Sequence, residues 1–130
     1  MATLTASLTL TGTDITSDAL SLTVSKALTV VSPIVNISKV TATNTGNETI
    51  ILSSLDSPRY VYLKHTGLNA AGSSSGTDKV HVETGDSSTI MELKAEEIAF
   101  FPYYAEGAGL LQLETSANTV QVEYAFFTRG

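Results

Sequence analysis

Two histidines and thirteen carboxylates are the residues of this 130-residue chain best suited to holding a metal ion, because the sequence has no cysteine. A zinc site needs three or four ligands that converge on one point. His65 and His81 form no His-x-His, His-x-x-x-His or His-Glu-x-x-His spacing, and metal-binding jelly rolls of the cupin type use clustered histidines. We therefore expect no metal site, with both histidines on strands or loops near the surface.

The carboxylates are not spaced for acid–base catalysis. Glu96 and Glu97 are adjacent, so on a strand they point to opposite faces, whereas a catalytic pair must face one substrate. We expect these two at a solvated corner. Asp14 and Asp18 flank a loop but lack the dense Asp, Asn and Gly pattern of a calcium loop. Because the chain also lacks a Gly-x-Ser-x-Gly elbow and a cysteine nucleophile, we expect neither enzyme activity nor a cofactor.

The charge balance argues against nucleic acid and membranes as partners. The net charge is −6, and the seven basic residues are scattered singly along the chain. Phosphate binding needs clustered Lys and Arg, and an anionic membrane surface repels an acidic protein. The sequence also lacks a membrane-spanning apolar segment and a secretory signal pattern. We expect no nucleic acid, no membrane, and synthesis in a cytoplasm.

The histidines and carboxylates must be positioned by strands. Thr3–Thr11 and Leu20–Val30 alternate Thr or Ser with apolar residues, which is the period of a strand. Turn signals recur about every 8–12 residues, and Met91–Glu97, the one helix candidate, fits a strand better. This spacing is typical of a sandwich or barrel, and we expect an all-β fold over residues 1–130: a single-domain antiparallel β-sandwich with about 8–10 short strands. Residues 1–31 are expected to form an N-terminal strand or arm segment involved in assembly.

The aromatic residues carry the main functional signal. Phe100-Phe101 and Phe126-Phe127 are adjacent pairs, so on strands one member of each pair must leave the core. Outward aromatics can form a sugar-binding platform or a contact between subunits, and the lack of Trp favours the subunit contact. The residues that we expect at such an interface are Leu4, Leu8, Leu10, Phe101, Tyr103, Tyr104 and Phe127.

Several segments resemble the small β-sandwich virion proteins of tailed bacteriophages, above all the capsid decoration or cement type. These segments are the alternating stretch Thr3–Val30, the strand and turn Tyr60–Gly67, the element Met91–Pro102 and the closing strand Val120–Phe127. Within Met91–Pro102 the usual corner has glycine where Glu96 stands here. The resemblance implies a jelly-roll-like body, self-association that is often trimeric, attachment to a capsid or tail lattice, and no catalytic residues.

The leading hypothesis is therefore a structural bacteriophage protein, a capsid decoration subunit that forms a homotrimer. Its partners would be the major capsid protein or other virion proteins, and its location the virion, after synthesis in the host cytoplasm. The alternative is a carbohydrate- or receptor-binding module of a phage tail or fibre, in which Tyr103, Tyr104 and the loop Gly67–Gly76 contact glycans. Position on the particle and oligomer number stay open at this point.

Overall fold

The computed structural model describes residues 2–15, 17–31, 37–44, 49–52, 59–104 and 110–130. These residues form strands and contain no helix, which confirms the all-β class. Within them, accordingly, no helix has the length and apolar character needed to cross a membrane. The strands are β1 (Ala2–Gly12), β2 (Leu20–Val30), β3 (Ser38–Ala42), β4 (Thr49–Leu52), β5 (Arg59–His65), β6 (Val80–Thr84), β7 (Thr89–Leu93), β8 (Ile98–Tyr103), β9 (Leu111–Thr115) and β10 (Val120–Thr128).

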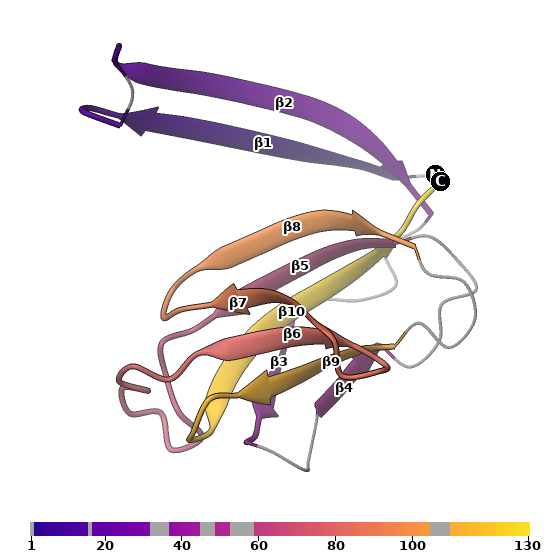
Figure 1. The fold of residues 1–130 in the computed structure, drawn as a ribbon. Coiled ribbons are helices and arrows are strands. Elements are labelled where there is room, and N and C mark those ends of the chain that lie inside the picture. Colours follow the sequence, from indigo (N-terminus) through magenta and orange to yellow (C-terminus); the bar gives the residue numbers. More distant parts are fainter. Residues whose placement is uncertain (1, 16, 32–36, 45–48, 53–58, 105–109) are drawn as a thin grey trace.

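Strands β3 to β10 build two antiparallel sheets that lie one over the other (Figure 1). We call the sheet β3-β10-β5-β8 the arm-side sheet and the sheet β4-β9-β6-β7 the distal sheet. The strands pair from the outside of the chain inward: β3 with β10, β4 with β9, β5 with β8 and β6 with β7. A long hairpin rolled up in this way is a jelly roll, so the expected jelly-roll-like sandwich is confirmed.

The core lies between the two sheets and follows the period-two alternation of the strands. Phe101 and Phe126 face this core, whereas Phe100 and Phe127 face the outer side of the arm-side sheet. Tyr103 also packs against the core, because it lies two residues after Phe101 on β8. Phe101 and Tyr103, both expected at a subunit interface, therefore lie on the core side of the arm-side sheet, where they are partly buried. Among the described residues, the apolar side chains of this core with no exposed surface are Ala42, Val61, Leu63, Val80, Val82, Leu111, Leu113, Val120 and Val122.

Strands β1 and β2 form a separate two-stranded hairpin, which we call the arm (Figure 1). Its register is regular from Ala2 opposite Val30 to Gly12 opposite Leu20. Because directly opposed residues share a face, one face carries Thr, Ser and Ala27, and the other is apolar apart from Lys26 and Gly12. The apolar side chains of that face are Ala2, Leu4, Ala6, Leu8, Leu10, Leu20, Leu22, Val24, Leu28 and Val30.

The arm is joined to the body at its base. The Val31 N–H donates to the carbonyl of Thr128 at 2.9 Å, and the Gly130 N–H donates to the carbonyl of Thr29 at 2.9 Å. Val30 at this base is 4% exposed, whereas Leu8 and Leu10 farther along the arm are 52% and 43% exposed. The arm is therefore held at one end and stands away from the arm-side sheet toward its tip, as Figure 1 shows.

The corner between β7 and β8 holds Glu96 in a backbone conformation that favours glycine. Glu96 has φ 68°, a left-handed conformation that glycine adopts most readily. Its N–H donates to the carbonyl of His65 at 2.9 Å, and the Glu97 carboxylate accepts the Lys94 N–H at 2.8 Å. Both glutamates therefore lie at an exposed corner, as the sequence predicts, and one of them closes the turn.

Candidate functional site

An apolar groove of about 740 Å³ lies between the arm and the outer face of the arm-side sheet. The arm contributes its apolar face near the base and middle, and the sheet contributes the outward side chains of β5, β8 and β10. Its principal side chains are Leu4, Ala6, Leu8, Val24, Lys26 and Leu28 from the arm, with Tyr60, Tyr62, Ile98, Phe100, Pro102 and Phe127 from the sheet.

Strand register builds the floor of this groove. Tyr60 is opposite Pro102 on one side and Phe127 on the other, and Tyr62 is opposite Phe100. Directly opposed side chains lie on the same face of a sheet, so these residues form one continuous aromatic and aliphatic surface. The rings of Tyr60 and Phe100 stack with centroids 5.9 Å apart.

The exposure of this surface sets it apart from ordinary surface apolar residues. Ile98 is 67% exposed and Phe100 42%, while Leu8 and Val24 across the groove are 52% and 53% exposed. Scattered apolar residues need no explanation on a protein surface, but a contiguous patch marks a place of interaction. The groove is therefore the candidate functional site.

Polar groups border the groove at two points. The Arg129 guanidinium lies over the Tyr60 ring with its Cζ 5.2 Å from the centroid, a distance at which a cation attracts an aromatic ring. The Tyr62 hydroxyl donates to Glu123 Oε1 at 2.8 Å. Desolvation, the hydrogen bond to Glu123 and the charge of that carboxylate together raise the pKa of Tyr62 to about 12. Tyr62 is therefore a neutral hydrogen-bond donor over the whole physiological range.

We expect Tyr62→Phe to abolish an ionisation near pH 12 in a titration followed by tyrosinate absorbance. An unfolded tyrosine loses its proton near pH 10, whereas folded Tyr62 keeps its proton until about pH 12. The folded state thus binds more protons between these values, so the stability contributed by Tyr62 is complete below pH 10 and declines above it. Tyr104→Phe, at an exposed position, is the matched control. A titration unchanged by Tyr62→Phe contradicts this assignment.

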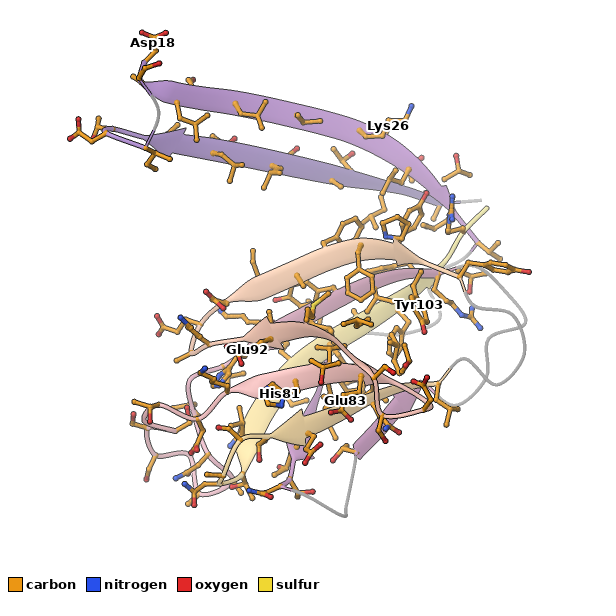
Figure 2. All side chains as sticks on the ribbon, in the orientation of Figure 1. Asp18, Lys26, His81, Glu83, Glu92 and Tyr103 are labelled. Atoms are coloured by element: carbon orange, nitrogen blue, oxygen red, sulfur yellow. The ribbon has the colours of Figure 1, made fainter. Side chains whose placement is uncertain are left out.

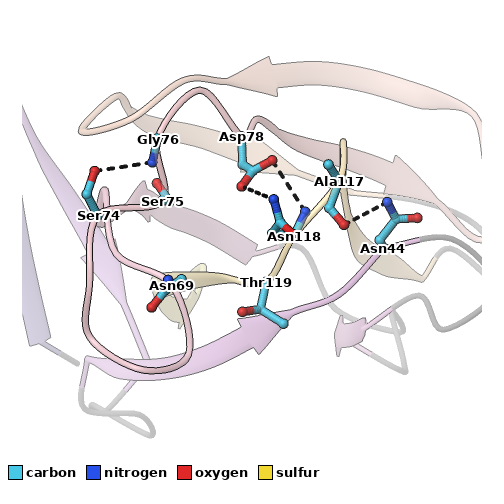
Figure 3. Close-up of a pocket in the computed structure, with 9 residues that line it drawn as sticks. All are labelled: Asn44, Asn69, Ser74, Ser75, Gly76, Asp78, Ala117, Asn118 and Thr119. Atoms are coloured by element: carbon cyan, nitrogen blue, oxygen red, sulfur yellow. Dashed lines mark hydrogen bonds between the residues drawn. The ribbon is translucent and has the colours of Figure 1, made fainter.

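A second hollow, of about 550 Å³, lies at the end of the sandwich where the loop after β5 meets the turn before β10 (Figure 3). Asp78 Oδ2 accepts a hydrogen bond from Asn118 Nδ2 at 3.1 Å, and Asp78 Oδ1 accepts one from the Asn118 N–H at 3.3 Å. Asn44 Nδ2 donates to the carbonyl of Ala117 at 2.8 Å. These polar groups bind one another, so they hold the loops together.

His65 supports the same loops from inside. It has no exposed surface, so the expectation that both histidines lie near the surface is wrong for this one. The Gly67 N–H donates to His65 Nδ1 at 3.0 Å, and Nε2 lies 2.9 Å from the carbonyl of Asp78. Because Nδ1 accepts, the proton is assigned to Nε2, which donates to Asp78. His65 therefore joins the beginning of the loop to its end.

His81 agrees with the sequence expectation, since it is partly exposed on β6 (Figure 2). Its Nε2 lies 3.2 Å from Glu92 Oε2, and Lys79 Nζ lies 3.0 Å from Glu92 Oε1. The lysine ammonium and, less strongly, the histidine lower the pKa of the Glu92 carboxyl. Among the described residues, no group of three His, Cys, Asp or Glu side chains is placed to hold a metal ion.

The two parts of the expected glycan site lie at opposite ends of β5. Tyr103 is opposite Arg59, the first residue of β5, whereas the loop Gly67–Gly76 follows His65, the last one. Tyr104 is 58% exposed beyond the end of β8. The structure therefore does not bring these tyrosines and this loop into one site.

Four of the seven expected interface residues lie in or beside the groove. Leu4, Leu8 and Phe127 line it, and Leu10 lies on the same face of the arm nearer the tip. Sequence reasoning omitted Ile98 and Phe100, although alternation on β8 with Phe101 inward places both outward. Comparison with protein-family models, curated proteins and solved structures found no match to this chain. The arm and the groove are therefore the features of the molecule that bear on its function.

Proposed function

We propose that this chain is a structural subunit that associates with copies of itself, and that the arm is its assembly element. The observation that carries this proposal is the one-sided arm, whose apolar side chains toward the tip are left open to solvent. Leu8, Leu10, Leu22 and Val24 are 52%, 43%, 42% and 53% exposed.

An arm of this kind needs a partner to be stable. An isolated two-stranded hairpin is marginal in water, and such a hairpin becomes stable when its apolar face is packed against another element. Burial of apolar surface contributes roughly 25 cal/mol per Å². The body of the same chain covers the base of the arm but leaves the part toward the tip exposed, so contact with another molecule supplies the missing burial.

The finer part of the proposal is a capsid decoration subunit of a bacteriophage, with a trimer as the favoured oligomer. The sequence resemblance supports this part, and the jelly roll is compatible with it, because viral capsid domains use this fold. Lectin and cupin domains use the same fold, so the fold alone does not select among these functions. Docking of several copies on a lattice multiplies contacts that are individually weak.

Light scattering coupled to size-exclusion chromatography tests the proposal. We expect the wild-type chain to form oligomers, and the double variant Leu8→Thr with Val24→Thr to shift toward monomer. These two positions are directly opposite on the arm. Thr is β-branched and suits a strand, and it replaces an apolar side chain by a polar one at both positions.

The matched control uses the other face of the same arm. Thr9 and Thr23 are also directly opposite each other, so Thr9→Ser with Thr23→Ser alters the polar face and is expected to leave the oligomer intact. Circular dichroism checks that both variants keep their strands. A wild-type chain that stays monomeric up to the highest soluble concentration refutes the proposed function.

A further inference from the structure

We propose that copies associate by exchanging arms, so that the apolar face of one arm docks on the outer face of the arm-side sheet of a second copy. This inference rests on the proposed self-association and names its contact surfaces. The receiving surface is the floor of the groove, made by Tyr60, Tyr62, Ile98, Phe100 and Phe127.

The contact between arm and sheet within one chain is incomplete. Hydrogen bonds fix the base of the arm to the end of β10, and from there the arm stands away from the sheet (Figure 1). The result is a groove of about 740 Å³ with apolar walls on both sides. Protein interiors are close-packed, and apolar walls that do not touch lose both burial and dispersion contacts.

A second copy offers the same sheet surface without the same restraint. An arm that reaches a neighbouring body is not tied to the end of that body's β10, so it can lie flat along the sheet. Exchange of an identical element replaces contacts within a chain by the same kind of contacts between chains, which makes it a low-cost route to an oligomer. The polar Thr and Ser face of the docked arm then remains toward solvent.

The contact between a docked arm and the sheet is apolar. Lys26 is the one charged residue on the apolar face of the arm, and Figure 2 shows its ammonium turned away from the body. On the outer face of the arm-side sheet, Glu123 lies directly between Lys39 and Lys64. Because these two lysines already neighbour the carboxylate, the apolar side chains, rather than an ion pair with Lys26, make the contact.

The available area is sufficient for a specific contact. β5 has seven residues, so at about 3.3 Å per residue the receiving surface is roughly 23 Å long, and a two-stranded arm is roughly 10 Å wide. In a closed ring as in a pair, each chain takes part in two contacts, one through its arm and one through its sheet, and these give about 900 Å² of projected area when both partners are counted. The accessible area of corrugated side chains exceeds this projection, and interfaces above roughly 1,000 Å² support specific association.

Disulfide trapping tests the exchange, because the natural chain has no cysteine. One variant carries Leu8→Cys, and a second variant, extended by a tag to change its mass, carries Phe100→Cys or Ile98→Cys. The two are mixed, unfolded in denaturant, refolded together and oxidised in a glutathione buffer. We expect a disulfide-linked band that contains one chain of each kind, since cysteines join when their Cβ atoms approach to about 4 Å.

A second mixture tests which face of the arm makes the contact. Thr9→Cys in place of Leu8→Cys puts the thiol on the polar face of the arm and is expected to lose the mixed band.

The outcomes separate this inference from the proposed function. If light scattering shows oligomers and no mixed band forms, arm exchange is overturned and self-association stands. If the chain is monomeric and a variant with both cysteines links within one chain, both proposals are overturned. A small apolar molecule retained by the monomer in native mass spectrometry likewise overturns arm exchange, since the groove then serves a ligand.

Discussion

Replacement of Leu63 by Ala is expected to lower the free energy of unfolding by about 3–4 kcal/mol. Leu63 has no exposed surface and lies on β5, which is hydrogen-bonded to β10 on one side and β8 on the other. The substitution removes apolar contacts and leaves a cavity that a strand held on both sides cannot collapse to fill. Because a domain is stable by only about 5–15 kcal/mol, this single change removes a large part of its stability. Urea unfolding followed by circular dichroism measures the shift of the midpoint.

Leu8→Ala is the matched control for this prediction. Leu8 lies on the arm and is 52% exposed, so the same chemical change removes little buried surface. At low protein concentration we expect the free energy of unfolding to fall by about 1 kcal/mol or less. Equal losses for Leu63→Ala and Leu8→Ala would mean that the space between the two sheets is not the main source of stability.

The interior of the sandwich was largely predictable from sequence, because the side-chain period of a strand is set by backbone geometry. Val61 and Leu63 alternate with Tyr60 and Tyr62, and the structure buries the first pair and turns the second pair outward. The order of strands in the sheets is a different matter. The pairing of β3 with β10 joins segments far apart in sequence, and alternation does not encode such pairings. The jelly-roll arrangement was expected through the resemblance.

The groove shows where sequence reasoning stops. Alternation states that one of Phe100 and Phe101 must leave the core, but it does not state which one. The structure places Phe101 opposite the buried Val61 and turns it inward. The sequence also identifies an apolar face on the arm without stating which surface it meets. That surface is assembled from three strands whose outward residues become neighbours only through register.

At His65 the strand alternation predicts burial correctly, whereas the usual exposure of histidine predicts a surface position. It follows Leu63 by two residues, so the alternation that buries Val61 and Leu63 also directs His65 into the sandwich. The expectation of an exposed histidine came from residue statistics, because histidine is most often partly exposed. The structure buries it because both ring nitrogens find backbone partners, at Gly67 and Asp78.

Replacement of His65 by Ala is expected to have the second large effect, lowering the free energy of unfolding by about 2–4 kcal/mol. The variant leaves the Gly67 N–H and the Asp78 carbonyl without their imidazole partner in a buried place, and an unsatisfied buried group costs about 1–3 kcal/mol. The space left by the ring adds a cavity. Urea unfolding gives the loss, and hydrogen exchange at the Gly67 amide is expected to accelerate, because the bond that protects it is gone.

His81→Ala is the control, since it removes the other histidine from the outer side of β6. His81 is partly exposed and contacts Glu92 at the surface, and exposed ion pairs contribute about 0–1 kcal/mol. The difference in the free energy of unfolding between the two variants therefore measures how much more a histidine contributes when it is buried and bonded to two backbone groups. If His65→Ala costs no more than His81→Ala, then the loops bordering the polar hollow are held by the hydrogen bonds of Asp78 with Asn118 and of Asn44 with Ala117. In that case the hollow owes its shape to those hydrogen bonds rather than to the buried ring beneath them.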